Sequence, residues 1–334
     1  MSFKRTSGST RLAITAMATM VAMAAMAALL LVAGEAAAQA YPGKPVRIVV
    51  PTSPGGASDV ITRIVAAPLT EILGQPFIVE NRPALVGTQQ VAQSAPDGHT
   101  LLATFDTFAI APFLYKSLPW DPIRDFAPIM QLCRFGQLLL VHPGLGVKTV
   151  KEFVALAKRK GADLNFGSAA PASSSRLAYE LFKNAAGIQT IPVHYRGGAP
   201  ALQALIAGQV QVMLIQGGGP IRQNVKSGNL VALAVSSPAR SPLFPELPTI
   251  AETYPGFETQ SWVGMFAPAG TPRPVTERLH HALARILADP GTKERFETQA
   301  AEIVAGTPEA LTRLLRDEQA KWGKIIRDEN IAID

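Results

Sequence analysis

The residues with the clearest chemical pattern lie between positions 48 and 64, in the stretch IVVPTSPGGASDVITRI. An apolar, β-branched run is followed by a turn of proline, glycine and serine, and then by apolar residues at helical spacing. A glycine-rich turn between a strand and a helix leaves backbone N–H groups unpaired at the helix N-terminus, where the helix dipole favours an anion. The pattern therefore predicts either an anion site or a tight turn that holds no ligand.

The nucleotide-binding versions of such a turn do not fit this stretch. They need G-x-x-x-x-G-K-[ST] or G-x-G-x-x-G, whereas Gly55 and Gly56 are adjacent and neither a lysine nor a third glycine follows them in the turn. A phosphate loop and a dinucleotide-binding loop are both poor interpretations.

Catalytic and metal-binding chemistry is largely excluded by residue type and spacing. The chain has no G-x-S-x-G nucleophile elbow, and its histidines lack the spacing of metal ligands. Cys133 is the only cysteine, so neither an internal disulfide nor a thiolate metal cluster can form. We predict no catalytic residue, no metal and no cofactor. An exported hydrolase or isomerase remains the less favoured alternative, with Asp59 and His194 as its candidate acid or base.

The elements that must position the turn are those of an α/β protein. Short apolar runs that end in small or polar residues predict strands at 46–50, 100–104, 164–169, 191–195, 210–215 and 231–237. Amphipathic segments between them predict helices: one ends at Gly74 and contains Pro68, one is capped by Thr149 and ends at Gly161, and one begins at Thr307. Such alternation predicts largely parallel sheets.

Three of the predicted strand-to-helix turns are rich in small residues and contain proline: TSPGGASD at 52–59, GSAAPASSSR at 167–176 and QGGGPIR at 216–222. Ligands of open parallel sheets gather at the carboxyl ends of the strands, and two domains whose strand ends face each other form a cleft. We therefore expect the three turns to contribute to a single site.

The first 40 residues have the pattern of an export signal. Basic residues precede an apolar run, and small residues at Ala38 and Ala40 match the A-x-A cleavage pattern. We predict a periplasmic protein with a signal peptide at 1–40, cleaved after Ala40, although an uncleaved anchor stays possible. The net charge of +6 is modest, the basic residues are scattered and aromatics are only 7%, so nucleic acid is not an expected partner.

Several segments together resemble one family. They are YPGKPVRIVVPTSPGGASDVITRIVAAPL, GQPFIVENRPALVGT, APDGHTLL, LPWDPIRDFAPI, LNFGSA, PVHYRGGAPALQALIAGQVQVM, SGNLVALAVSSPARSPLFPELPTIAE and SWVGMFAPAGTP. In this order and at these separations they resemble the Bug or TctC family, the exported solute receptors of tripartite tricarboxylate transporters. The combination of GGASD, VENRP, APDG and APAGTP is specific to this family, although none of these motifs is specific by itself.

The resemblance implies a two-domain periplasmic-binding-protein fold of type II, with a mostly parallel sheet flanked by helices in each domain and a ligand cleft between them. We expect a discontinuous domain 1 at 41–141 plus 263–334 and a domain 2 at 142–262. In the family, backbone N–H groups and small polar side chains of the turns hold the ligand carboxylates. The expected ligand-binding residues are Thr52, Ser53, Gly55, Gly56, Ser58, Asp59, Asp106, Thr107, Ser168, Ala169, Ser173, Ser174, Arg176, Tyr195 and Gln216.

Three positions depart from the family pattern. Arg176 stands where histidine is usual, so it either binds a second carboxylate in bidentate fashion or begins a helix in solvent. Ile215 and Gln216 occupy a region that often contains an aspartate, which favours ligands without an ammonium group. VENRP continues as ALVG, where the family is richer in glycine.

The sequence therefore predicts a receptor that captures a small organic carboxylate and closes by hinge motion. Dicarboxylates, tricarboxylates, aromatic acids and neutral amides all remain open as ligands. Its partner would be the membrane permease of a tripartite transporter or, alternatively, a sensor kinase, and a scaffold of the same fold without a transport role is the second alternative.

Overall fold

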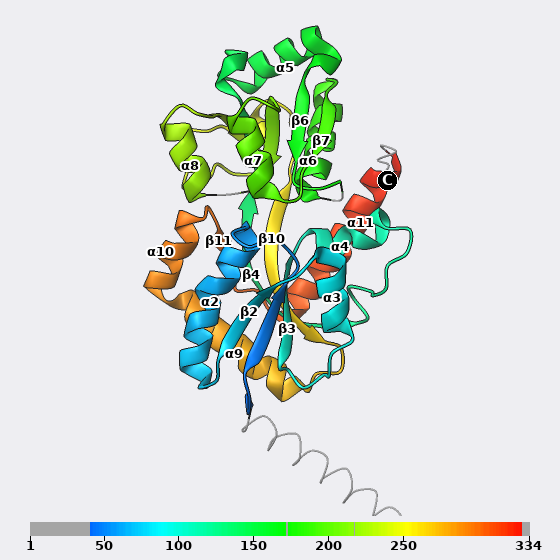
Figure 1. The fold of residues 1–334 in the computed structure, drawn as a ribbon, viewed down its shortest axis with the longest axis vertical. Coiled ribbons are helices and arrows are strands. Elements are labelled where there is room, and N and C mark those ends of the chain that lie inside the picture. The colour runs from blue at the N-terminus through cyan, green and yellow to red at the C-terminus, as the bar shows by residue number, and fades with distance from the viewer. Residues whose placement is uncertain (1–40, 172, 217, 329–334) are drawn as a thin grey trace, which may run out of the picture.

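The computed structural model describes residues 41–171, 173–216 and 218–328. The predicted signal peptide at 1–40 lies outside the described residues. Two sheets, each covered by helices, form two domains that are stacked along the long axis of the molecule (Figure 1). None of the helices within the described ranges is long and apolar enough to cross a membrane.

The first domain is built on a six-stranded sheet of order β11-β4-β10-β3-β1-β2. Its strands are β1 (Val46–Val50), β2 (Phe77–Asn81), β3 (Thr100–Phe105), β4 (Phe126–Gly136), β10 (Gln260–Pro268) and β11 (Glu302–Ile303). One face packs against α2 (Ala57–Leu73), α9 (Arg273–Ala288) and α10 (Pro290–Thr298). The other face packs against α3 (Ala84–Ala92), α4 (Thr107–Leu114) and α11 (Pro308–Asp328).

The second domain is built on a five-stranded sheet of order β7-β6-β8-β5-β9. Its strands are β5 (Leu138–Val141), β6 (Asn165–Ser168), β7 (Ile191–His194), β8 (Val212–Ile215) and β9 (Val231–Val235). Helices α5 (Val150–Lys160) and α6 (Ser174–Ala186) cover one face, whereas α7 (Gly198–Ile206) and α8 (Gly219–Lys226) cover the other. Short 3₁₀ helices lie at Pro143–Leu145, Gly161–Asp163 and Ile250–Glu252.

The α/β class and the six predicted strands are confirmed, but the sheets are mixed rather than mostly parallel. The strands that precede the predicted turns are parallel, because β1 pairs with β2 and β3, and β6 pairs with β7 and β8. The antiparallel pairs involve β4, β5 and β10, which lie where the chain passes from one sheet to the other. The short runs of local sequence do not reveal this reversal of direction.

The predicted helix signals are present at the expected residues. Thr149 caps α5 by accepting a hydrogen bond from the Glu152 N–H at 3.1 Å. The Glu152 carboxylate accepts from the Lys148 N–H at 2.7 Å rather than from the Thr149 N–H, so the capping box is only half formed. Helix α2 ends before Gly74, whose φ of 74° is left-handed.

The chain crosses between the sheets at two places that lie side by side. Strand β4 leads through Gln137 into β5, and Thr259 precedes β10. The buried Ser236 hydroxyl joins the two crossings: it accepts from the Gln137 N–H at 2.8 Å and donates to the Thr259 carbonyl at 2.6 Å. Ser236 is therefore a hydrogen-bonding node at the hinge.

Sheet membership suggests domain boundaries slightly different from those expected. Residues 138–141 pair within the second sheet, and residues 260–262 pair with β4 in the first. We therefore propose that the crossings lie at 137 and 259 and that the first domain resumes at 260.

Candidate ligand-binding site

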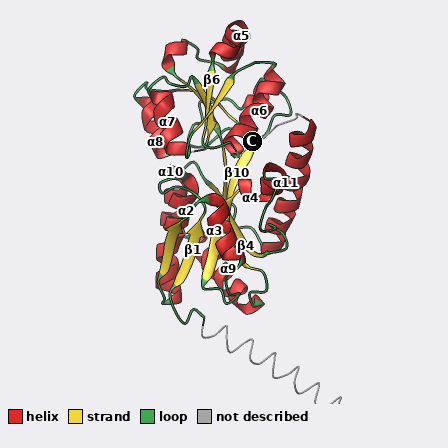
Figure 2. Cartoon of the chain, turned by 45° about the vertical axis from the view of Figure 1, so that its right-hand side comes forward, coloured by secondary structure: helices red, strands yellow, loops and turns green. Residues whose placement is uncertain are grey.

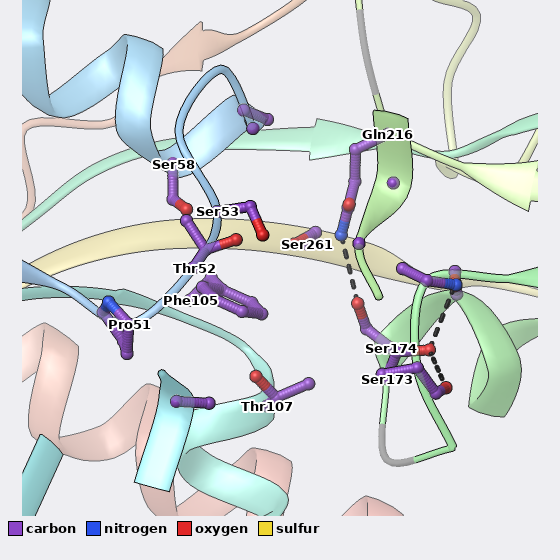
Figure 3. Close-up of a pocket in the computed structure, with 18 of the residues that line it drawn as sticks. Pro51, Thr52, Ser53, Ser58, Phe105, Thr107, Ser173, Ser174, Gln216 and Ser261 are labelled. Atoms are coloured by element: carbon purple, nitrogen blue, oxygen red, sulfur yellow. Dashed lines mark hydrogen bonds between the residues drawn. The ribbon is translucent and has the colours of Figure 1, made fainter. Parts of the chain in front are cut away.

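A cavity of about 820 Å³ lies between the two domains and is lined by residues of both. Thr52 and Ser53 of the first domain face Ser174 and Gln216 of the second across it, and Ser261 of β10 lies between them (Figure 3). This volume is typical of a site for a small organic molecule.

Ten of the fifteen predicted site residues line this cavity. They are Thr52, Ser53, Gly55, Gly56, Ser58, Thr107, Ala169, Ser173, Ser174 and Gln216. The other five do not line it: Asp59, Asp106, Ser168, Arg176 and Tyr195. All three predicted turns reach the cavity, so the structure brings them together as expected.

In the first turn, the two glycines do not supply free donors. Gly55 has a left-handed φ of 80°, which favours glycine, and its N–H donates to Asp59 Oδ2 at 2.9 Å. The Gly56 N–H donates to the Ser53 carbonyl at 3.3 Å. The unpaired donors are instead the first amides of α2, at Ala57 and Ser58, which have no hydrogen-bond partner in the described part of the chain.

Asp59 holds this turn in shape from behind. Its buried carboxylate accepts from the Gly55 N–H, from Arg63 Nε at 3.0 Å and from Asn81 Nδ2 at 2.9 Å. Burial acts to raise the pKa of Asp59, but the hydrogen bonds from Arg63, Gly55 and Asn81 outweigh it and leave the pKa below its ordinary value. Asp59 therefore makes local hydrogen bonds within the first domain and, in contrast to the expectation from the sequence, does not line the cavity.

The facing turn presents the N-terminus of α6. Ser173 caps this helix by accepting from the Arg176 N–H at 3.3 Å, and its hydroxyl donates to the Ala170 carbonyl at 2.8 Å. Gln216 Nε2 donates to Ser174 Oγ at 3.1 Å, which ties the third turn to the second (Figure 3). The first amides of α6, at Ser174 and Ser175, have no partner among residues 41–171, 173–216 and 218–328.

Three predicted residues of the second domain have partners elsewhere and do not line the cavity. Ser168 Oγ lies 2.6 Å from His194 Nδ1. Arg176 Nη1 donates to the Pro171 carbonyl at 3.1 Å, and its Nε lies 4.0 Å from Glu180 Oε1. Tyr195 packs against the apolar cluster under α7 and α8. A ligand contact by Arg176 is therefore not part of the site that we propose below.

Six of the described helices begin at the cavity. The lining includes the starts of α2, α3 and α4 in the first domain and of α6, α7 and α8 in the second. Each start presents the positive end of a helix dipole, and the starts of α2 and α6 also leave their first N–H groups unpaired. Their convergence from both domains favours an anion in the cavity.

The charged side chains at the cavity are positive, like the helix N-termini that face it. Within the described lining, only Arg82 and Arg196 carry charge, and both are exposed at the rim. Arg82 also lies 3.3 Å from Glu80. No acidic residue of the described chain lines the cavity, so an anion would meet little repulsion there.

Sequence reasoning missed much of the apolar wall. Phe105, Phe108, Trp120 and Phe135 line the cavity, and Trp120 Nε1 is buried with no hydrogen-bond partner in the described residues. Trp120 stacks on Phe108 with ring centroids 5.2 Å apart. The β3–α4 turn offered a partial signal because it follows a predicted strand, but nothing local in the sequence marks Phe135.

The loop after β2 also lines the cavity, through residues 81–85. Its departure from the glycine-rich family pattern does not remove it from the site.

Asp106 lies directly behind the wall at the start of α4. It is 2% exposed. Its Oδ1 accepts from the Thr107 N–H at 2.8 Å, whereas its Oδ2 has no hydrogen-bond partner in the ranges that the structure describes. Burial raises the pKa of Asp106 to about 7; the nearby hydroxyl of Ser261 acts to lower it, the charge of Glu318 acts to raise it, and the hydroxyl of Ser174 acts to lower it.

The two domains touch beside the cavity. Leu177 of α6 is buried together with Ile110 and Leu114 of α4 and with Trp322 and Ile326 of α11. Helix α11 lies along the first domain with its C-terminal end toward α6 (Figure 2). We call these five residues the interdomain seam.

A second contact between the domains lies at the start of α8. A side chain at Gly218 would collide with the backbone of Thr298 and Gln299 in the first domain. The cavity is therefore bounded on two sides by contacts between the domains. Among the described residues, no group of three or more His, Cys, Asp or Glu side chains could hold a metal ion.

Comparison with known proteins assigns this architecture to a family. Residues 61–331 match the model of the tripartite tricarboxylate transporter family receptor, TctC. The chain is 36% identical over 292 residues to the UPF0065 protein of the tcbD-tcbE intergenic region of Pseudomonas sp. strain P51, which covers 86% of this chain and 87% of that protein. It is 32% identical over 302 residues to BugT of Bordetella pertussis, which covers 89% and 92%.

Solved structures show the same fold. The periplasmic binding protein BugD superposes with a TM-score of 0.81 at 32% identity, over 87% of this chain and 99% of BugD. Rhodopseudomonas palustris Rpa4515, solved with adipate, gives a TM-score of 0.84 at 32% identity over 87% and 99%. MatC from the same organism, solved with bound malate, gives 0.79 at 30% identity over 86% and 100%. The chain belongs to the TctC family of receptors, which includes the Bug periplasmic solute-binding proteins.

Proposed function

We propose that this chain is a periplasmic receptor that binds a small organic carboxylate between its two domains and delivers it to the permease of a tripartite tricarboxylate-type transporter. The convergence of six helix N-termini on one cavity, with arginines as the only charged lining residues described, supports this proposal most directly. Relatives solved with adipate and malate support the carboxylate class. We also propose that export removes the signal peptide after Ala40.

In this proposal, the ligand carboxylate lies between the starts of α2 and α6. The unpaired amides of Ala57 and Ser58 approach it from one domain, and those of Ser174 and Ser175 from the other. Charge-assisted hydrogen bonds of this kind are each worth about 1.5–3 kcal/mol. Because the donors belong to different domains, the anion itself would hold the domains closed.

The first test is a thermal-shift panel on the chain from Tyr41 onward. Adipate, malate and benzoate would be compared with their amides, using protein refolded from denaturant to remove any ligand carried through purification. A carboxylate at about a thousand times its Kd adds about 4 kcal/mol to the free energy of unfolding, which raises the Tm by several degrees. A shift with a carboxylate but not with its amide is expected; no shift with any compound contradicts the proposal.

The second test removes a single donor. Ala57 is the first residue of α2, a position where proline is favoured, and Gly56 before it has φ −69° and ψ 161°, which suits a residue preceding proline. Ala57→Pro should therefore fold normally but lack one N–H, and weaken carboxylate binding by about 10- to 100-fold. Ala57→Gly keeps the N–H and is the matched control. Equal affinity of the two variants would contradict the assignment of this amide to the ligand.

A further inference from the structure

We propose that Asp106 takes up a proton when the domains close on the carboxylate, so that the receptor binds its anion together with one proton. This inference rests on the proposed function and assigns a role to a buried carboxyl group that the ligand clamp does not use.

The placement of Asp106 is unusual for an acidic residue. Its neighbours Phe105 and Thr107 both line the cavity, and the hydroxyls of Ser261 and Ser174, which act on its carboxyl group, line it as well. The carboxyl group therefore lies one layer behind an anion site. Ser174 belongs to the second domain, so this environment is complete only when the domains are closed.

Burial without a cation favours the neutral acid of Asp106. Oδ1 has a backbone donor, but Oδ2 and the hydroxyl oxygen of Ser261 are both buried and lack partners in the described structure. The protonated Oδ2 can donate to the Ser261 oxygen, and an ionised Oδ2 can accept from the Ser261 hydroxyl, so Ser261 can pair with either form. An ionised carboxylate in the same place would be buried without a cation, which is costly.

The charged groups on the surrounding elements do not supply that cation. On α11, Glu318 lies close enough to repel a charge on Asp106, and Lys321 donates to the Glu258 carbonyl on the hinge side. On α6, the charges of Arg176 and Glu180 lie 4.0 Å apart. Strands β3 and β10 have no charged residue.

These surroundings explain why Asp106 should take up a proton, rather than release one, when an anion binds. Burial raises the pKa of Asp106 to about 7 in the closed chain without ligand. A ligand carboxylate in the adjacent cavity adds a like charge and raises the pKa further. Opening of the domains admits water and removes the burial that raises the pKa, which returns it toward its ordinary value. The Ser174 hydroxyl, which is lost at the same time, acts in the other direction but has a smaller effect than burial. Closure on an anion and proton uptake are therefore coupled in both directions.

Calorimetric titration tests the coupling, with adipate as the probe, or malate if adipate does not bind. For the wild-type chain, Kd should rise by up to tenfold per pH unit above pH 7. The binding enthalpies in phosphate and Tris buffers should report an uptake that approaches one proton per ligand at pH 8. Asp106→Asn mimics the neutral acid, so its Kd should stay constant from pH 6 to 9 with no proton uptake.

Two matched variants exclude other titrating groups. Glu318→Gln removes the neighbouring carboxyl group, and His194→Gln removes the imidazole next to the second turn; both should retain the proton uptake. A wild-type Kd constant within twofold from pH 6 to 9, or a pH dependence that persists in Asp106→Asn, would overturn the inference.

If neither adipate nor malate binds, that result counts against the proposed function alone. A measurement without ligand then still tests the role of Asp106. Small-angle X-ray scattering should show the wild-type chain becoming more extended between pH 6 and 8.5 as Asp106 ionises. Asp106→Asn should stay compact throughout. Identical pH profiles for the two chains would refute a role for Asp106 in closure.

Discussion

Replacing Asp106 with asparagine should raise the free energy of unfolding at alkaline pH and leave it unchanged at acidic pH. Below about pH 4 the carboxyl group is protonated in both the folded and the unfolded chain. Between pH 4 and 7 the folded chain retains a proton that the unfolded chain has released, because burial holds the folded pKa at about 7. The free energy of unfolding of the wild type therefore falls as the pH rises, and the fall ends above pH 7.

The size of this effect follows from the two pKa values. The interval from the ordinary value of 3.8 to about 7 corresponds to about 4 kcal/mol between pH 4 and pH 8. This figure is an upper bound, because opening of the two domains would solvate Asp106 at a lower cost than unfolding. Asparagine keeps an oxygen that can accept from the Thr107 N–H and places an N–H₂ group where the protonated Oδ2 stands.

Urea unfolding at pH 5, 6, 7 and 8, followed by circular dichroism without ligand, measures the effect. The urea midpoints of the wild type and Asp106→Asn should differ least at pH 5. The difference should grow as the pH rises, with the variant unfolding at the higher urea concentration. A difference that is independent of pH would mean that Asp106 does not titrate in this range, and would refute the reasoning.

Asp59, at the start of α2 on the other face of the sheet, provides a control in which the stability change has the opposite sign. Its carboxylate is buried too, but three donors hold its pKa below the ordinary value. A lowered pKa contributes stability above the unfolded pKa that is lost as the pH falls through the folded one. Asp59→Asn should therefore lower the free energy of unfolding at pH 6 to 8, by about 2 kcal/mol from lost charge-assisted hydrogen bonds.

Two further predictions concern the contact and the hinge between the domains. Leu177 is fully buried in the interdomain seam. Leu177→Ala should therefore weaken the closed state by about 2 kcal/mol and raise the Kd for a carboxylate, measured by calorimetry, about thirtyfold. An unchanged Kd would show that the seam does not contribute to closure. Ser236→Ala leaves the Gln137 N–H and the Thr259 carbonyl without their shared partner and should lower the free energy of unfolding by about 2 kcal/mol. Ser237→Ala removes only a bond to a carbonyl two residues away, and a loss as large as that of Ser236→Ala would argue against a special role for the node.

The local parts of the fold were predictable because each follows from a short pattern. The strand at 46–50, the stop at Gly74 and the cap at Thr149 depend on residues within one turn or strand of each other, and all were found. The three cavity-lining turns were predictable for the same reason. Strand direction was less predictable, because the antiparallel pairs join segments such as β4 and β10, which are far apart in sequence.

The function of individual polar groups was harder to predict, because it depends on partners brought by the fold. The glycine N–H groups looked like ligand donors until Asp59 and Ser53 were seen to accept from them. Arg176 looked available at a helix start, yet Glu180 lies one helical turn further on. The burial of Asp106 depends on tertiary contacts that no local pattern encodes.

In the proposed site, the use of backbone donors would allow the second turn to depart from the family pattern and still bind an anion. A helix N-terminus presents the same N–H groups whether the preceding loop contains glycine and histidine or AAPASSSR, provided that the helix begins at the same place. Ser173 fixes that place for α6 by capping it. Anion binding therefore carries little information about which carboxylate is bound. In the proposed receptor, discrimination between ligands would fall to the side chains that line the cavity. Phe105 and Trp120 would favour an apolar body, and Arg196 at the rim would favour a second anionic group.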